Sequence, residues 1–104
     1  MDRNKYQVDG AVDDIMPLYD VEAKLRSFGW FTQSVDGHDI ASLLAAITIA
    51  KTVKDRPCAI IMDTVKGKGY YEFEEMAGAT HHMKVPKDMG ERAIAYFKQQ
   101  IAQF

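Results

Sequence analysis

The chain has 104 residues, of which 47% are hydrophobic and 27% are charged, as in an ordinary small globular domain. Its net charge of −2 argues against a nucleic-acid partner bound by charge, and no apolar run approaches the roughly 20 residues of a membrane helix. Because its first residues are polar, we expect no signal peptide. We therefore expect a cytoplasmic protein with no nucleic acid and no membrane as partners.

The first half of the chain predicts a loop followed by alternating helices and strands. Residues 1–15 are polar and contain too few apolar residues for a strand, so they are expected to form a loop that closes at Gly10. A short amphipathic helix follows, with Asp20 as its N-cap and Gly29 as its stop. Residues 30–35 are aromatic and β-branched, which is typical of a strand.

The next segment predicts a turn, a helix and a second strand. Residues 36–39 form the turn, and Asp39 is placed to cap a helix over residues 40–53, whose apolar positions recur at three and four residues. Residues 58–62 are apolar without alternation, as expected of a strand that is buried on both faces. Within that run Cys58, the single cysteine, is expected to be a small buried hydrophobe.

A basic loop follows the second strand and has two interpretations. Lys66, Gly67, Lys68 and Gly69 offer positive charge and mobile backbone at the carboxyl end of a parallel strand, where open α/β sheets bind anionic ligands. The alternative is an ordinary basic turn, because lysine and glycine are common in loops. These four residues alone do not separate the two.

After Tyr70 the chain is expected to be irregular, with a small-residue loop over residues 76–80 and a last helix over residues 87–104. Strands alternating with helices predict an α/β fold: a partial, open parallel sheet with flanking helices. Only two strands are predicted, whereas parallel sheets usually have more. The chain is therefore expected to be part of a larger α/β layer.

Several motifs occur in a consistent order: D-R-N-K-Y-Q-V-D-G at 2–10, F-G-W at 28–30, V-D-G-H-D at 35–39 and D-T-V-K-G-K-G at 63–69. Together they resemble transketolase-like, thiamine-diphosphate-dependent enzymes over nearly the whole chain up to Pro86. The resemblance is closest to the C-terminal part of the diphosphate-binding domain, carried by the N-terminal subunit of split transketolases. It implies that residues 1–104 form that part of an incomplete thiamine-diphosphate-binding fold.

The resemblance implies a cofactor site with a divalent cation, Mg²⁺ or Ca²⁺. Asn4 falls on the family's asparagine ligand, and the carbonyl of Tyr6 on the family's backbone ligand; both are oxygen donors, which such cations prefer. Val8 matches a position near the cofactor ring. Lys66 matches a loop residue close to the cofactor, and Gly67 lets the backbone approach it.

A histidine segment completes the implied site. His82, followed by Lys84 and Pro86, is similar to the family segment in which a histidine near the diphosphate helps with proton handling or orientation, so His82 is the predicted catalytic residue. His81 duplicates the imidazole and is the alternative. His38, in contrast, is expected to order its turn rather than to contact substrate.

The departures from the family pattern shape the functional hypothesis. The 104 residues contain no G-D-G, which supplies the family's aspartate ligand, and no second domain that could supply the activating glutamate. We expect a fragment or split piece of an enzyme that transfers a two-carbon ketol unit between sugar phosphates. This piece is expected to be inactive alone and to assemble with a complementary segment or subunit, or with further copies of itself. The rival interpretations are a non-catalytic interaction module of the same fold and a site for another phosphate, such as a nucleotide.

Overall fold

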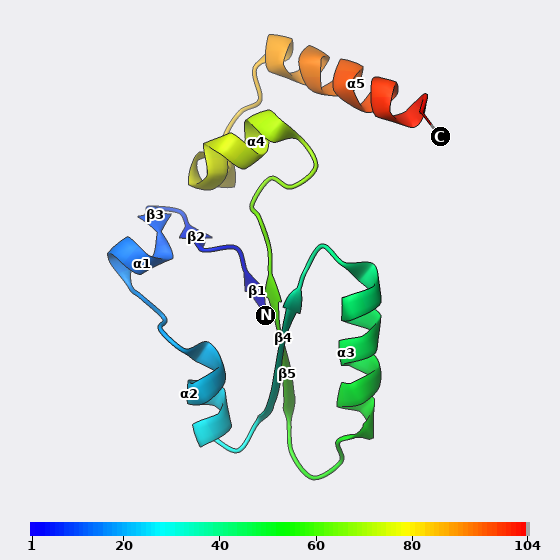
Figure 1. The fold of residues 1–104 in the computed structure, drawn as a ribbon. Coiled ribbons are helices and arrows are strands. Elements are labelled where there is room, and N and C mark those ends of the chain that lie inside the picture. Colours follow the sequence, from blue (N-terminus) through cyan, green and yellow to red (C-terminus); the bar gives the residue numbers. More distant parts are fainter. Residues whose placement is uncertain (104) are drawn as a thin grey trace.

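A three-stranded parallel sheet lies at the centre of the computed structural model, which describes residues 1–103 (Figure 1). Its strands are β1 (Asp2–Arg3), β5 (Cys58–Asp63) and β4 (Phe31–Asp36), in the spatial order β1-β5-β4. The register pairs β4 with β5 along their whole length, from Phe31 opposite Cys58 to Asp36 opposite Asp63. The predicted α/β class, a partial parallel sheet with flanking helices, is confirmed.

Two helices cover opposite sides of this sheet (Figure 1). They are α2 (Val21–Ser27) and α3 (Ile40–Thr52), and both predicted N-caps are present. The Asp20 carboxylate accepts the Ala23 N–H at 2.8 Å, and the Asp39 carboxylate accepts the Ala41 N–H at 3.0 Å. Each cap satisfies a backbone donor that the first helical turn leaves unpaired, which fixes where each helix begins.

The prediction of a loop over residues 1–15 is wrong in part. The structure forms β1, then a hairpin of β2 (Tyr6–Gln7) and β3 (Gly10–Ala11), then the one-turn helix α1 (Val12–Ile15). β1 is polar because Arg3 does not enter an apolar core: its guanidinium makes two hydrogen bonds of 2.6 Å to Asp63, at the end of β5. The sheet therefore has a third strand that hydrophobic periodicity does not detect.

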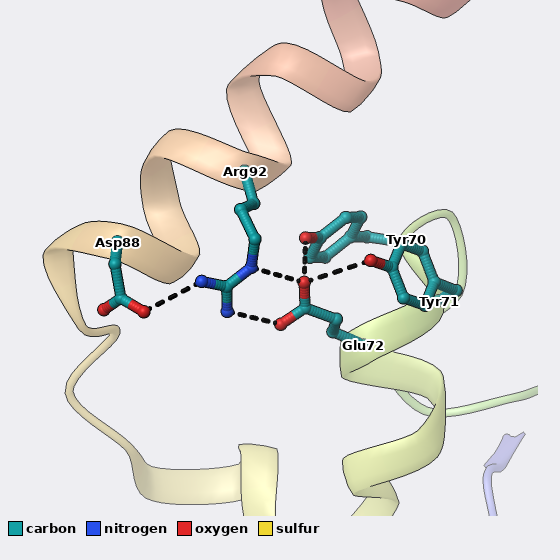
Figure 2. Close-up of polar contacts among 5 residues, drawn as sticks. All are labelled: Tyr70, Tyr71, Glu72, Asp88 and Arg92. Carbon is teal, nitrogen blue, oxygen red and sulfur yellow. Dashed lines mark hydrogen bonds and ion pairs between the residues drawn. The ribbon is translucent and has the colours of Figure 1, made fainter.

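The expectation of irregular structure after Tyr70 is also wrong. Residues 71–82 form the short helix α4 (Tyr71–Met76) and the 3₁₀-helix η1 (Ala77–His82), and the predicted last helix is α5 (Lys87–Ile101). α4 has no side-chain cap. Its support is tertiary: Glu72 accepts hydrogen bonds from the hydroxyls of Tyr70 and Tyr71 and from Arg92 of α5 (Figure 2).

The buried side chains fall into two groups. Ile61 near the centre of β5 is 0% exposed, and Ala46 of α3, a helix that contacts β5, is 2% exposed. The second group surrounds Tyr70, which is 2% exposed; its ring lies 5.3 Å from that of Phe73 and 5.4 Å from that of Tyr96 in α5. α5 is thus attached to α4 and lies away from the sheet (Figure 1).

Two smaller predictions concern Cys58 and the membrane. Cys58 is half-buried, with its sulfur 3.6 Å from the carbonyl oxygen of Ala50 in α3, so its thiol packs between β5 and α3. Within residues 1–103, no helix has the length and apolar character needed to cross a bilayer.

Candidate functional site

A cavity of about 800 Å³ opens where the carboxyl ends of the three parallel strands meet. We call it the edge cavity. Its lining comes from β1 and the residues after it, from α1, from the turn after β4 and from the loop after β5. Charged side chains of both signs line it, among them Asp2, Arg3, Lys5, Asp36, Asp63 and Lys68. The carboxyl edge of a parallel sheet is the usual ligand site in open α/β folds.

Asn4 lies in the lining of the edge cavity, directly after β1, and its side chain has a defined orientation. Its Oδ1 accepts the backbone N–H of Tyr6 at 2.9 Å, and its Nδ2 donates to Asp2 Oδ2 at 3.2 Å. A carbonyl oxygen has two lone pairs, so Asn4 Oδ1 keeps one for a further partner.

The backbone carbonyl of Tyr6 is on the same side as the Asn4 amide. Tyr6 is opposite Ala11 in the β2–β3 hairpin, and the adjoining pair is joined by the Val12 N–H donating to the Lys5 carbonyl at 2.9 Å. Hydrogen-bonded and non-bonded pairs alternate in an antiparallel ladder, so Tyr6 directs both its N–H and its carbonyl away from β3. Since that N–H reaches Asn4 Oδ1, the ladder geometry directs the Tyr6 carbonyl to the side on which the Asn4 amide lies.

The histidine segment packs against this hairpin. η1, which ends at His82, presses Gly78 against the ring of Tyr6: a Cβ on Gly78 would lie 2.8 Å from Tyr6 Cδ1. Glycine at this position therefore lets η1 approach the hairpin closely. As a result the segment that carries His81 and His82 lies beside the hairpin that contains Tyr6.

Two contacts hold the edge cavity in shape. The Arg3 guanidinium, hydrogen-bonded to Asp63, lowers the pKa of that carboxyl and has its own pKa raised in turn. His38 accepts the Val65 N–H on Nε2 at 2.8 Å, while its own backbone N–H donates to Asp36 Oδ1 at 2.8 Å. His38 thus orders its turn, as expected, and also joins that turn to the loop after β5.

The other predicted cofactor residues lie outside the lining of the edge cavity. Val8 is 66% exposed at the hairpin tip, and His82 is exposed in η1. Lys66 Nζ is 3.4 Å from Nδ1 of His81, which makes His81 rather than His82 the neighbour of that lysine. Gly67 has a φ of +80°, and a Cβ there would lie 2.6 Å from the carbonyl oxygen of Phe73 in α4. The close packing of α4 is therefore enough to explain a glycine at this position, with or without a cofactor.

The donor set fits a hard cation held in part by other groups. Within the described residues, no cluster of three or more histidine, cysteine, aspartate or glutamate side chains is arranged to hold a metal. Asn4 Oδ1 and the Tyr6 carbonyl are the kind of oxygen ligands that Mg²⁺ and Ca²⁺ take alongside phosphate oxygens and carboxylates.

Sequence reasoning missed Asp2, which contacts Asn4, and the Arg3–Asp63 pair. The spacing D-x-N at residues 2–4 was a usable signal for Asp2, because side chains two residues apart in an extended segment point to the same face. No local signal marks Asp63 as the partner of Arg3, since the two are 60 residues apart.

Comparison with known proteins gives a consistent result. Residues 1–101 match the family model described as "Transketolase, thiamine diphosphate binding domain". The chain is 40% identical to the 6-deoxy-6-sulfo-D-fructose transketolase subunit SqwG of Clostridium sp. (strain MSTE9), over 97% of this chain and 36% of that protein. It is 25% identical to one subunit of the apulose-4-phosphate transketolase of Phocaeicola vulgatus, with the same coverage of both chains.

A third relative is much longer than this chain and aligns with a smaller share of it. The chain is 39% identical to human transketolase-like protein 2, over 73% of this chain and 12% of that protein. The chain thus spans just over a third of the subunits it matches and about an eighth of this longer relative.

Proposed function

Because this chain belongs to the transketolase family, through its thiamine diphosphate binding domain, we propose that it forms one side of a thiamine diphosphate site. In this proposal the parent enzyme transfers a two-carbon ketol unit between sugar phosphates, in the cytoplasm. The observation that carries the proposal is the contact of Asn4 Oδ1 with the Tyr6 N–H at the edge cavity, where the hairpin register directs the Tyr6 carbonyl to the same side.

Asn4 and Tyr6 would hold the divalent cation, Mg²⁺ or Ca²⁺, that bridges to the diphosphate. Both donors are neutral, so the negative charge that the cation requires comes from the diphosphate and from a carboxylate. The 104 residues contain no G-D-G, and we assign that carboxylate to a complementary segment or subunit. The names of the two related subunits support such a division, because each protein is named as one part of a transketolase.

Positive charge near the edge cavity would favour the diphosphate. Lys5 and Lys68 line it, and Lys68 lies in the basic loop after β5. Lysine acts on phosphate as a point charge on a flexible stem, so it needs no preset geometry. Lys68 Nζ lies 3.5 Å from Glu74 Oε2 and would exchange this partner for the diphosphate. We propose that Lys66 adds a third such charge from the same loop, with Gly67 allowing the backbone to pass close to the cofactor.

Val8 and the histidine segment are the residues that we propose to lie nearest the reacting groups. Bound thiamine diphosphate supplies a stabilised carbanion, and the protein orients it and excludes water. We propose that Val8 packs near the cofactor ring and that His82 orients the substrate or handles its proton. His81, which contacts Lys66, is the alternative to His82 in that role. The names of the related subunits contain a sulfosugar and a sugar phosphate, which supports an anionic sugar as substrate.

Calorimetric titration tests the proposal directly. The chain is titrated with thiamine diphosphate and Mg²⁺, alone and after assembly with its complementary segment, and binding is expected in the assembled form. Asn4→Ala is expected to weaken Mg²⁺ binding roughly tenfold or more. Gln7→Ala is the matched control, because it removes a side-chain amide of β2, three residues after Asn4, that does not line the edge cavity. An assembled complex that forms but binds no cofactor would support the non-catalytic interaction module instead.

A further inference from the structure

The amide of Asn4 can serve a cation only in one of its two orientations. Its oxygen and its NH₂ group are nearly identical in shape, and a half-turn about the last side-chain bond exchanges them. A divalent cation binds the oxygen and is repelled by the NH₂ group. Something in the chain must therefore select the orientation before a cation arrives.

Two neighbours make that selection in the structure. Asn4 Nδ2 donates to Asp2 Oδ2 at 3.2 Å, and Asn4 Oδ1 accepts the Tyr6 N–H at 2.9 Å. In the reversed orientation the amide oxygen would face the Asp2 carboxylate, acceptor against acceptor, and the NH₂ group would face the Tyr6 N–H, donor against donor. Both contacts would be lost, so the observed orientation is the favoured one.

Asp2 is itself fixed by a different element. Its other carboxylate oxygen, Oδ1, accepts a hydrogen bond from the hydroxyl of Thr64, which directly follows β5. Asp2 also lies in β1, opposite Met62 of β5 in the parallel register. A chain of hydrogen bonds thus runs from Thr64 through Asp2 to Asn4, and it connects the end of the sheet to the candidate ligand.

We propose that Asp2 is a positioning residue, which holds the Asn4 amide with its oxygen available to the divalent cation. The inference rests on the proposed function, because it takes Asn4 as a cation ligand. It adds a carboxylate that acts through Asn4 rather than on the cation, and it makes Thr64 the anchor of that carboxylate.

Three variants separate orientation from charge. Asp2→Asn keeps an acceptor for Asn4 Nδ2 and a donor for the Thr64 hydroxyl but removes the negative charge. Asp2→Leu has a similar size and offers no polar atom. Asp13→Asn removes one negative charge elsewhere in the lining of the edge cavity, and within residues 1–103 Asp13 makes no hydrogen bond to Asn4.

The first readout needs neither metal nor cofactor. The side-chain NH₂ resonances of Asn4 are recorded in a ¹⁵N–¹H correlation spectrum of the full chain, and their exchange with water is measured. Asp2→Leu is expected to shift these resonances and to speed their exchange, whereas Asp2→Asn and Asp13→Asn leave the exchange rate close to that of the unaltered chain. Unchanged Asn4 resonances in Asp2→Leu would overturn the inference.

The second readout is Mg²⁺ affinity in the presence of thiamine diphosphate, measured on the chain assembled with its complementary segment. Asp2→Leu is expected to weaken Mg²⁺ binding roughly tenfold or more, as the loss of a group that orients a ligand does. Asp2→Asn should weaken it no more than Asp13→Asn does. A loss in Asp2→Asn as large as in Asp2→Leu would overturn the inference, because charge would then explain both.

Asn4→Ala distinguishes failure of this inference from failure of the proposed function. If Asn4→Ala weakens Mg²⁺ binding and Asp2→Leu does not, the positioning role of Asp2 is refuted while the cation site stands. If Asn4→Ala leaves Mg²⁺ binding unchanged, the cation lies elsewhere and both proposals are refuted.

Discussion

Replacing Gly67 by alanine tests how the basic loop is packed, and a second glycine supplies the matched control. Gly67 has a φ of +80° and Gly29 a φ of +84°, so alanine meets the same backbone strain at either position, about 1–2 kcal/mol. Around Gly29 nothing lies within 4 Å of the added Cβ. At Gly67 the Cβ would lie 2.6 Å from the oxygen and 2.7 Å from the carbon of the Phe73 carbonyl group, which belongs to backbone that cannot rotate away.

The difference between the two variants therefore measures the steric contact. Overpacking of this kind costs about 1–3 kcal/mol, so Gly67→Ala should lose about 2–5 kcal/mol in total and Gly29→Ala about 1–2 kcal/mol. Urea denaturation of both variants gives the free energies of unfolding. Because α4 could also move locally, amide exchange of Phe73, whose N–H donates to the Tyr70 carbonyl at 3.0 Å, is measured in parallel. Equal stability of the two variants, with slow exchange at Phe73 in both, would refute the reasoning.

Three further predictions concern the core, a helix cap and the attachment of α5. Ile61→Ala, at a side chain that is 0% exposed, should lower the free energy of unfolding by about 2–5 kcal/mol in a urea titration, and a loss below that of Ile61→Val would contradict the burial. Asp20→Ala should lose about 1 kcal/mol in the same assay, and Asp20→Ser should restore most of it if capping is the cause. Hydrogen bonds from Arg92 and then Tyr70 lower the pKa of Glu72 to about 2 from its ordinary value of 4.5. The ionised Glu72 carboxylate therefore stabilises the folded chain fully above pH 4.5, and this contribution is lost as the pH falls towards 2. Near-ultraviolet circular dichroism of the tyrosines should report an acid transition between pH 4.5 and pH 2 in the unaltered chain, and Glu72→Gln should lack this transition. The same transition in the unaltered chain and in Glu72→Gln would refute the role of Glu72.

Local sequence determines the elements that were predicted correctly. Asp20 and Asp39 each accept a backbone N–H of the helix that follows, an interaction that needs only residues two or three positions away. β5 is apolar along most of its length because it is the central strand of the sheet. In both cases the signal and the structure are close in sequence, so periodicity and capping residues are sufficient.

Long-range contacts determine the elements that were missed. β1 is two polar residues, and Arg3 is held by Asp63 of the distant strand β5. α4 lacks a side-chain cap and depends on Arg92, which is 20 residues further along the chain. Neither partner can be identified from the local pattern, because the pattern carries no information on which distant side chain will be near.

The same distinction holds for the candidate site. The resemblance directed attention to Asn4 and Tyr6, and the hairpin register then supplied the reason why their oxygens share one side. It gave no indication of Asp2, whose role depends on the hydroxyl of Thr64, 62 residues away. Asn4 and Tyr6 were proposed as ligands from the sequence, whereas the hydrogen bond of Asp2 to Thr64 became known only from the fold.

The parallel pairing of β1 with β5 has a consequence for the order in which this chain folds. β4, α3 and β5 are consecutive and form a unit whose paired strands are 27 residues apart, as Phe31 and Cys58 are. β1 instead closes a loop of 60 residues, at an entropic cost of about 3–4 kcal/mol, and gains in return two register pairs and the side-chain contacts of Arg3 with Asp63 and of Asp2 with Thr64. β1 should therefore join the sheet last. Asn4 contacts Tyr6 only two residues further on, so that contact does not depend on β1. The hydrogen bond from Thr64 to Asp2, which connects Asn4 to the sheet, can form only in this last step of folding.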